Sequence, residues 1–361
     1  MPHSEPLPQR ADVAVYIGRF QPFHRGHLAL LRQALALAPR CVVVLGSAHQ
    51  ARTPKNPFTW QERAEMVRLA LSEDERSRVR FLPVRDYYDE TRWVTAVRDG
   101  VSRLLAGEGM PSHAHVTLVG HFKDATSEYL HGFPGWRLTP VERVAAVDAT
   151  AVRDAWFGAG ADDREAALAA LVEHLPPSTT AFLRAWSALP HHEELAEEWR
   201  LLRHYKQSWS AAPYPPVFVT VDSVVACSGR VLLVRRGQAP GKGLLAVPGG
   251  FIEQRETAYQ SALRELQEET GLALLDTTMR QCLKATAVFD HPDRSQRGRT
   301  ITHAHYFELG ERELPEVQGG DDAAQALWVP VDELTAFEDQ FLDDHFHMLD
   351  HFLGLTEEPH T

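Results

Sequence analysis

Cysteine is scarce in this chain, and long apolar runs are missing. The three cysteines, Cys41, Cys227 and Cys282, are far apart and form no CxxC pair. This spacing argues against a disulfide framework or a cysteine-ligated zinc site, and it predicts buried, reduced thiols. No run of 18 apolar residues occurs, and the opening MPHSEPLPQR lacks the apolar stretch of a secretory signal. We therefore expect no membrane span and a cytoplasmic protein.

Positive charge is also in short supply. The sequence has 37 Lys and Arg against 49 Asp and Glu, a formal net charge of -12. Affinity for nucleic acid depends on accumulated positive charge, so this balance argues against a nucleic-acid partner but allows a local basic pocket. Hydrophobic residues at 44% and charged residues at 24% are typical of a globular protein. The length of 361 residues favours two domains.

The first third of the chain alternates apolar runs with helical segments. Apolar residues 11–17 lead into the loop GRFQPFHRG, a helical segment and then the apolar run CVVVLG. This order of strand, helix and strand predicts a parallel sheet. Further alternation up to HVTLVG predicts a doubly wound α/β domain.

The second half has a different pattern. Helical, charged sequence over 160–210 ends at the proline-rich AAPYPPV, which marks a domain junction. Beyond it, short β-rich runs surround one expected helix at 258–270, which is an α+β arrangement. We predict a first domain over 1–185, a helical and proline-rich linker over 186–215 and a second domain over 216–361. The histidine-rich HFHMLDH segment is expected to be a helical surface rather than a metal site.

Three glutamates lie on one face of the expected helix at 258–270. Glu265, Glu268 and Glu269 follow the i, i+3, i+4 spacing, so their like charges repel unless a cation lies between them. Hard divalent cations with oxygen ligands, Mg²⁺ or Mn²⁺, meet this need and also bind pyrophosphate. Arg264 is expected to form a bidentate pair with Glu256. The pattern predicts a divalent metal site in which the three glutamates are the ligands.

The full spacing around this helix resembles the Nudix box. Gly250 is followed after five residues by Glu256 and after seven more by RELQEETGL, a match at every fixed position. The resemblance implies attack of a metal-activated water on a pyrophosphate, with Glu269 and Glu268 as catalytic residues. Gly250 is expected to let the loop backbone approach the metal and substrate. Gly271 is expected to end the helix in a left-handed conformation.

An arginine cluster lies downstream of the box. The stretch VFDHPDRSQRGRTITHAHYF resembles the corresponding part of Nudix domains that handle ADP-ribose, including those fused to adenylyltransferases. The resemblance implies that Arg294, Arg297 and Arg299 hold phosphate or ribose. A solvated basic loop is the alternative account of the same residues.

Two histidines open the first helix of the first domain. His24 and His27 form an HxGH pattern at the carboxyl end of the first expected strand. A helix N-terminus offers free N–H groups and a positive dipole end, and both imidazoles can donate to phosphate oxygens. The HxGH pattern resembles the signature of the nucleotidyltransferase superfamily, and this resemblance implies that ATP binds here, with His24 and His27 as catalytic residues. Phosphoryl-type transfer from ATP depends on positioning and charge neutralisation, so no nucleophilic Ser or Cys is expected.

The lead-in GRFQPFHRGH resembles the nucleotidyltransferase superfamily, and most of residues 11–185 resemble nicotinamide-nucleotide adenylyltransferases of the archaeal-like class. This resemblance implies a Rossmann-like fold in which Arg153 binds the ATP β- and γ-phosphates. It also implies that Trp93 stacks on the nicotinamide ring, although a core tryptophan is the alternative. Asp148 and Ala149 stand where many relatives have a small hydroxyl residue, which puts one phosphate contact in doubt. The implied ATP and mononucleotide site comprises Gly18, Arg19, Phe20, Gly26, Ser47, Asn56, Arg63, Trp93 and Thr150.

Together these patterns predict a bifunctional enzyme of NAD metabolism. The resemblances imply that the first domain joins ATP and nicotinamide mononucleotide into NAD and pyrophosphate, and that the second hydrolyses ADP-ribose to AMP and ribose 5-phosphate. Both reactions are expected to need Mg²⁺. One alternative is a Nudix half that binds ADP-ribose or NAD as a sensor, and another is adenylyl transfer to a different acceptor. The intact carboxylate set favours catalysis over sensing. The sequence leaves open the choice between nicotinamide and nicotinate mononucleotide and whether the chain forms a homo-oligomer.

Overall fold

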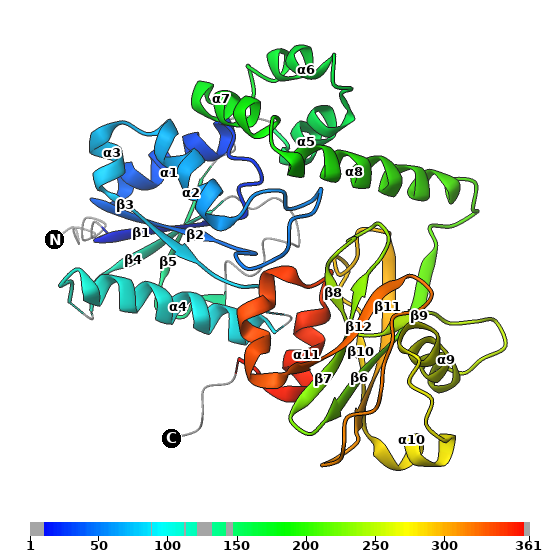
Figure 1. Cartoon of the computed structure of the whole chain (residues 1–361). Coiled ribbons are helices and arrows are strands. Elements are labelled where there is room, and N and C mark those ends of the chain that lie inside the picture. Colours follow the sequence, from blue (N-terminus) through cyan, green and yellow to red (C-terminus); the bar gives the residue numbers. More distant parts are fainter. Residues whose placement is uncertain (1–10, 88, 112, 121–131, 142–146, 357–361) are drawn as a thin grey trace. The chain divides into compact units, whose positions relative to one another are not determined.

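The computed structural model describes residues 11–87, 89–111, 113–120, 132–141 and 147–356 (Figure 1). The chain divides into two compact units, Met1–Ala196 and Glu197–Thr361. The boundary falls in helix α8, Pro190–Ser208, inside the segment predicted as a linker. All three cysteines are free and buried, as predicted. In the parts of the chain that the structure describes, no helix is long and apolar enough to cross a membrane.

The first unit is built on a parallel sheet in the order β3-β2-β1-β4-β5. Its strands are β1 Val13–Gly18, β2 Arg40–Leu45, β3 Val79–Pro83, β4 Val116–Gly120 and β5 Arg137–Pro140. The helices before α8 are α1 Arg25–Leu37, α2 Trp60–Ala70, α3 Glu73–Ser77, α4 Glu90–Gly107, α5 Ala149–Gly158, α6 Arg164–Ala170 and α7 Pro177–Trp186.

Both faces of this sheet are covered by helices. Alternate valines of β1 and β2 pack against the apolar stripe of α4 on one face. Helix α1 contacts β1, β2 and β4, and Figure 1 shows α1 and α2 on the side of the sheet away from α4. The core cluster beneath α4 includes Val13, Val15, Val42, Val44, Val94, Val97 and Val101. The predicted doubly wound α/β fold is therefore confirmed.

The order of the strands reverses at β1. This strand lies between β2 and β4, and the chain leaves its carboxyl end at Gly18 to enter α1. Open parallel sheets bind ligands in the crevice outside such a switch point. The loop between β1 and α1, which carries the HxGH pattern, lies at this position.

The second unit is a mixed sheet in the order β10-β11-β6-β7-β12, with β8 paired to β7 and β9 paired to β6. The β6 and β11 strands are parallel, whereas the other pairs are antiparallel. Its elements are β6 Val217–Cys227, β7 Arg230–Arg236, β8 Leu245–Ala246, β9 Gly249–Phe251, α9 Ala258–Thr270, α10 Asp276–Cys282, β10 Leu283–Phe289, β11 Arg299–Glu308, β12 Ala323–Pro330, η2 Val331–Gln340 and α11 His345–Leu353. The α+β prediction is confirmed.

Two apolar cores lie on opposite faces of the mixed sheet. Val224 of β6 packs with η2 and α11, while the adjacent Val225 packs with α9 and α10. Helix α11 contains the HFHMLDH segment, so the predicted helix is confirmed. The predicted surface position is wrong for His345, Met348 and Leu349, which are buried because α11 forms one wall of a core.

Candidate active sites

His24 and His27 stack against each other at the N-terminus of α1. Their ring centroids are 3.5 Å apart and their planes differ by 16°. The backbone N–H of His27 donates to Nδ1 of His24 at 3.2 Å, and that of His24 donates to Nδ1 of His27 at 3.3 Å. The two imidazoles thus form a capping box. Because each Nδ1 accepts a hydrogen bond, a neutral ring carries its proton on Nε2.

Aromatic neighbours keep His27 uncharged. Phe20 meets the His27 ring edge-on with a centroid distance of 4.9 Å, and Phe23 stacks on it at 5.8 Å. Burial, and then the neighbouring His24, hold the pKa of His27 well below its ordinary value of 6.5. His27 is therefore a neutral Nε2–H donor at pH 7, a suitable partner for a phosphate oxygen.

The turn after β1 depends on a glycine. A Cβ on Gly18 would lie 2.7 Å from the ring of Phe20, which folds back over the strand end with a left-handed φ of 54°. The Arg19 side chain is exposed, and Gly26 is buried in the first turn of α1. Four of the predicted site residues thus lie in the turn and helix start that carry the two histidines.

Arg153 of α5 reaches the same turn. Its Nη1 donates to the backbone carbonyl of Gln21, and its Nη2 donates to Oγ1 of Thr150 at 3.2 Å. Burial lowers the pKa of Arg153 to about 10, so the side chain stays a cation at neutral pH. Asp148 is the N-cap of α5 and accepts from the Thr150 N–H at 2.9 Å. Aspartate and hydroxyl residues both cap helices, which accounts for Asp148 where relatives have a hydroxyl residue.

A polar cluster follows β2. The buried Ser47 donates to Asp86 from Oγ at 2.6 Å and from its backbone N–H at 3.2 Å. Gln50 also donates to Asp86, at 2.9 Å, and the Asn56 amide donates to Gln50 at 2.7 Å. Oδ1 of Asn56 is buried and has no hydrogen-bond partner among the described residues. The sequence prediction missed Asp86 and Gln50, although Asp86 lies only a short way before the predicted Trp93 in the sequence.

The last two predicted residues of this site have contrasting surroundings. Trp93, in the first turn of α4, is half-buried and meets Phe133 edge-on at a centroid distance of 6.0 Å. Its stacking on nicotinamide stays a prediction. Arg63 has no exposed surface and donates to backbone carbonyls of the turns after β1 and β2.

In the second unit, α9 has the bounds and ends that its sequence predicts. Thr257 caps the N-terminus through a capping box with Gln260, and Gly271 ends the helix with a φ of 68°. Arg264 pairs with Glu256 as predicted, but only through Nε, at 3.0 and 3.3 Å. Its Nη1 donates instead to Glu265 at 2.8 Å and Glu268 at 2.9 Å. The guanidinium therefore connects three carboxylates of the box rather than forming one bidentate pair.

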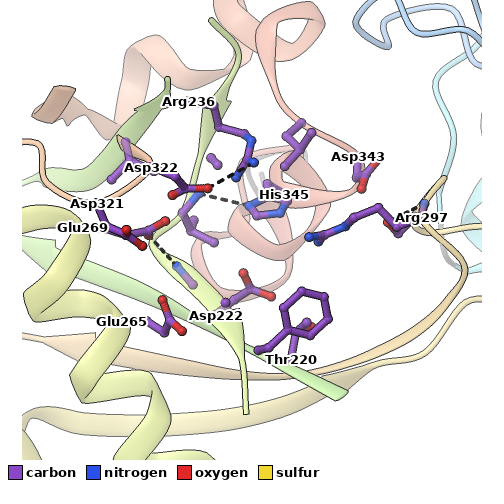
Figure 2. Close-up of a pocket in the computed structure, with 18 of the residues that line it drawn as sticks. Thr220, Asp222, Arg236, Glu265, Glu269, Arg297, Asp321, Asp322, Asp343 and His345 are labelled. Atoms are coloured by element: carbon purple, nitrogen blue, oxygen red, sulfur yellow. Dashed lines mark hydrogen bonds and ion pairs between the residues drawn. The ribbon is translucent and has the colours of Figure 1, made fainter. Parts of the chain in front are cut away.

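A cavity of about 300 Å³ lies beside this helix (Figure 2). Its walls come from β6, β7, β9 and α9 and from the loops that precede β11, β12 and α11. Glu265 and Glu269 of α9 line it together with Gly250, whereas Glu268 is not among the lining residues and its side chain is 48% exposed. The structure thus brings two of the three predicted metal ligands into one cavity.

Two further carboxylates, Asp321 and Asp322, line the cavity beside Glu269 (Figure 2). Burial, together with Asp322, raises the pKa of Glu269 to about 9, and burial followed by Glu268 and Asp321 raises the pKa of Glu265. One oxygen of Glu269 accepts from the Gly249 N–H at 2.8 Å. The carboxylates are therefore crowded, and a proton or a cation must offset their charge.

The donor set fits a hard divalent cation. Glu265, Glu269, Asp321 and Asp322 supply only oxygen atoms, which Mg²⁺ and Mn²⁺ prefer. Among the residues that the structure describes, no three Asp, Glu, His or Cys side chains stand ready as a metal centre. One reason is that Arg264 forms ion pairs with Glu265 and Glu268. Glu265 lines the cavity while it is paired with Arg264, so Arg264 competes with a cation for this carboxylate.

The sequence prediction missed Asp321 and Asp322. They belong to a GGDD segment whose glycines let the loop pass close to the end of α9. A Cβ on Gly320 would lie 2.4 Å from the backbone oxygen of Glu268, and the Gly320 N–H donates to the Glu269 carbonyl at 3.1 Å. An acidic pair directly after two glycines was the available signal, but only the folded loop shows which helix it meets.

The three predicted arginines occupy different positions. Arg294 and Arg297 line the cavity, and Arg299 at the start of β11 is not among its lining residues. Arg294 is 5% exposed and forms a bidentate pair with Asp344, with both distances 2.8 Å. Arg297 lies over the ring of Phe251 at 5.2 Å from its centroid. Arg297 is thus the better placed of the three to meet a ligand.

Four more residues of the cavity wall were not predicted. Asp222 is buried and accepts from the Thr302 hydroxyl, and Arg236 forms an ion pair with Asp322 at 3.3 Å. Figure 2 shows Asp343 near Arg297, and burial followed by Asp344 raises the pKa of Asp343 to about 6. His345 accepts from the Val247 N–H through Nδ1 at 3.1 Å. These four residues belong to no recognisable sequence motif, so the sequence gave no indication of their position in the cavity.

His345 makes the stability of the second unit depend on pH. Burial lowers its pKa to about 3 from 6.5, against the effect of Asp344, and Arg294, Arg236 and Arg297 lower it further. Between about pH 6.5 and 3, His345 is therefore protonated in the unfolded chain but not in the folded chain. The free energy of unfolding falls as the pH drops through this range. We expect His345→Gln, which keeps an acceptor for Val247, to flatten this fall by up to about 1.4 kcal/mol per pH unit. Urea denaturation of both proteins at pH 7, 6, 5 and 4 checks this, and parallel stability curves would contradict it.

Comparisons with known proteins find relatives of both units. A NUDIX domain model matches residues 216–352, and a Cytidylyltransferase-like model matches residues 15–96. The nicotinamide/nicotinic acid mononucleotide adenylyltransferase of Acinetobacter baylyi is 32% identical over 191 residues, 52% of this chain and 94% of that protein. The ADP-ribose pyrophosphatase of Methanocaldococcus jannaschii is 34% identical over 116 residues, 32% of this chain and 63% of that protein.

One solved structure is similar along nearly the whole chain. The bifunctional NMN adenylyltransferase/ADP ribose pyrophosphatase from Francisella tularensis has 32% sequence identity and a TM-score of 0.86, covering 95% of this chain and 99% of that one. A second structure of the Francisella protein, with AMP and a manganese ion, has 31% identity and the same TM-score of 0.86. Since identity and coverage are this high over both units, the chain belongs to the family of bifunctional NMN adenylyltransferase/ADP-ribose pyrophosphatase proteins.

Proposed function

We propose that the first unit transfers the adenylyl group of ATP to nicotinamide mononucleotide. A phosphate oxygen of the mononucleotide attacks the α-phosphorus of ATP, and the bond to the β-phosphate breaks, which yields NAD and pyrophosphate. The Nε2–H groups of His24 and His27 and the α1 N-terminus donate to the phosphate oxygens on which negative charge increases. Arg153 supplies positive charge for the pyrophosphate that leaves.

The remaining residues of this site hold the two substrates. The exposed Arg19 lies in the turn beside the histidines, where a triphosphate meets the helix N-terminus. The buried Oδ1 of Asn56 can accept from an amide of the mononucleotide, and Trp93 offers an aromatic face for its base. The name of the Acinetobacter relative includes both nicotinamide and nicotinic acid mononucleotide. Both acceptors therefore belong in the assay.

The second unit hydrolyses ADP-ribose to AMP and ribose 5-phosphate in the cavity beside α9. Glu265 and Glu269 hold a divalent cation, for which we propose Mg²⁺, and Glu268, which lies outside the cavity lining, contributes less to its binding. Glu269 also accepts a proton from the attacking water. When bound, the cation neutralises diphosphate charge and makes the water more acidic. Arg297 is positioned at the cavity wall to hold a phosphate or ribose oxygen.

The observation that carries the proposal is the presence on one chain of a stacked histidine pair at a helix N-terminus and an oxygen-lined acidic cavity. Purified protein with Mg²⁺ should form NAD from ATP and the mononucleotide, and AMP from ADP-ribose. A chelator should stop both reactions. Absence of NAD would reject the first activity. If calorimetry showed binding of ADP-ribose while chromatography showed no release of AMP, the second unit would be a sensor of ADP-ribose rather than a hydrolase.

Gly250 offers a steric test of the metal site. A Cβ at this position would lie 2.4 Å from the Glu265 carboxylate, which must then move. We expect Gly250→Ala to lower ADP-ribose hydrolysis by about 10- to 100-fold. The thermal midpoint should change little, because the displaced group ends a flexible side chain. Gly107→Ala is the control, since a Cβ there meets nothing within 4 Å. Equal hydrolysis by the two variants would show that Glu265 needs no such fixed position.

A further inference from the structure

Arg63 is a buried cation whose hydrogen bonds go to the backbone. It lies in the first turn of α2 with 0% of its surface exposed. Nη1 donates to the carbonyl oxygens of Arg19 and Gly46, both at 2.7 Å. Nη2 donates to the carbonyl of Ser47 at 3.1 Å, and Nε donates to that of Thr59 at 3.3 Å. One guanidinium thus joins the turn after β1 to the turn after β2.

Both turns hold a residue in the left-handed region. Phe20 has a φ of 54° and follows the Arg19 carbonyl, and Ser47 has a φ of 51° and follows the Gly46 carbonyl. This conformation is costly for side chains with a Cβ and persists only where the surroundings enforce it. The Gly46 N–H also donates to the Gly18 carbonyl at 3.1 Å. The guanidinium and this bond together fix the two strained turns relative to each other.

Asp86 and the buried Gln21 also hold these two turns. Asp86 accepts from the N–H and Oγ of Ser47, while the Gln21 amide exchanges two hydrogen bonds with the Phe58 backbone, at 2.9 and 3.0 Å. Arg63 supplies donors to carbonyls, and Asp86 supplies acceptors to an N–H and a hydroxyl. Burial lowers the pKa of Arg63 to about 10, so it keeps its charge at neutral pH.

We propose that Arg63 is a positioning residue for adenylyl transfer, which clamps the turns carrying Arg19, Phe20 and Ser47 and makes no contact with substrate. The sequence alone had placed it among the residues that bind ATP or the mononucleotide. Four of its five N–H donors are already committed to backbone carbonyls, and the side chain has no exposed surface with which to meet a ligand. The inference rests on the adenylyl transfer proposed above. Since the reacting groups must be held within fractions of an ångström, release of the clamp acts on turnover more than on binding.

The test compares Arg63→Met and Arg63→Lys with Arg68→Met. Arg68 is on the same helix with its side chain 51% exposed, so it is the matched control. At a temperature where every variant is fully folded, we expect Arg63→Met to lower kcat for NAD formation by about 10²-fold. The Kd for ATP should change by less than about threefold, on the same argument. Arg63→Lys should recover part of kcat, because an ammonium can still donate to two of the carbonyls. Arg68→Met and the hydrolysis of ADP-ribose should be unaffected.

Two kinetic outcomes would overturn the proposal. A Kd for ATP that rises by about tenfold or more with kcat retained would make Arg63 a substrate contact. Unchanged kcat and KM in the folded Arg63→Met variant would reduce its role to packing.

Amide hydrogen exchange measures how firmly Arg63 holds the two turns, independently of any catalysis. Peptides covering residues 18–24 and 46–50 should exchange faster in Arg63→Met than in Arg68→Met. Unchanged exchange would reject the clamp. If the wild-type protein formed no NAD while exchange still increased, the proposed reaction would fail and the clamp would stand.

Discussion

Replacing Glu269 by Gln is expected to lower ADP-ribose hydrolysis by about 10³-fold while NAD formation stays at the wild-type level. Glu269 is 3% exposed, lines the cavity and accepts from the Gly249 N–H. Glutamine keeps the size of the side chain but carries no negative charge for a metal and cannot accept a proton. Initial rates of AMP release and of NAD formation on the same preparation give both readings.

The amide is also expected to leave the fold intact. The pKa of Glu269 is raised to about 9, so the metal-free protein carries a neutral carboxyl there at pH 7, and glutamine resembles that state. Glu313→Gln, at an exposed loop position, is the matched control for charge. Hydrolysis by Glu269→Gln at a rate close to that of the control would remove Glu269 from the catalytic set.

Glu268→Gln separates the roles within the box. Its side chain is 48% exposed and its only described partner is Arg264, so it contributes less to the closed part of the cavity. A loss of hydrolysis much smaller than for Glu269→Gln would match that placement. It would also show that glutamates on the same face of a helix do not have equal roles.

The sequence predicted those parts of the protein that depend on local pattern. The helix at 258–270 follows from its capping residues and from the glycine at 271, and these are interactions within a few residues. The histidine pair follows in the same way, because strand, turn and helix succeed one another directly in the chain. Local signals of this kind determine local structure.

The parts that were missed depend on contacts between distant segments. Asp322 meets Glu269 only because a loop 53 residues further along passes over the end of α9. His345 is buried because α11 packs on β6 and η2, whereas its own histidine-rich sequence indicated a surface. Arg63 was placed at the substrate site by resemblance, and that role is untested. Its described hydrogen bonds go to backbone carbonyls, which the sequence does not distinguish from one residue to another.

Replacing His27 by Ala is expected to lower NAD formation by about 10²- to 10³-fold, as loss of one preorganised donor does at a site of developing charge. The change removes the Nε2–H that we propose donates to phosphate, the acceptor of the His24 N–H and the ring on which His24 stacks. Hydrolysis of ADP-ribose should be unchanged, because the carboxylate site lies in the other compact unit. Steady-state assays of both reactions check this result. His27→Ala should lose NAD formation and keep hydrolysis, whereas Glu269→Gln should lose hydrolysis and keep NAD formation.

The protonation state of His27 allows a second test of its role, through the pH dependence of NAD formation. An ordinary histidine would gain a proton near pH 6.5, but the pKa of His27 lies well below that value because of burial and His24. A neutral donor therefore persists through pH 6.5, and kcat/KM for NAD formation should show no change attributable to this ring between pH 7.5 and about 6. His27→Asn, whose side-chain amide can still donate and accept, should retain more activity than His27→Ala. If alanine and asparagine were equally active, or if both reactions fell together, a hydrogen bond from His27 to phosphate could not be what the first unit uses for catalysis.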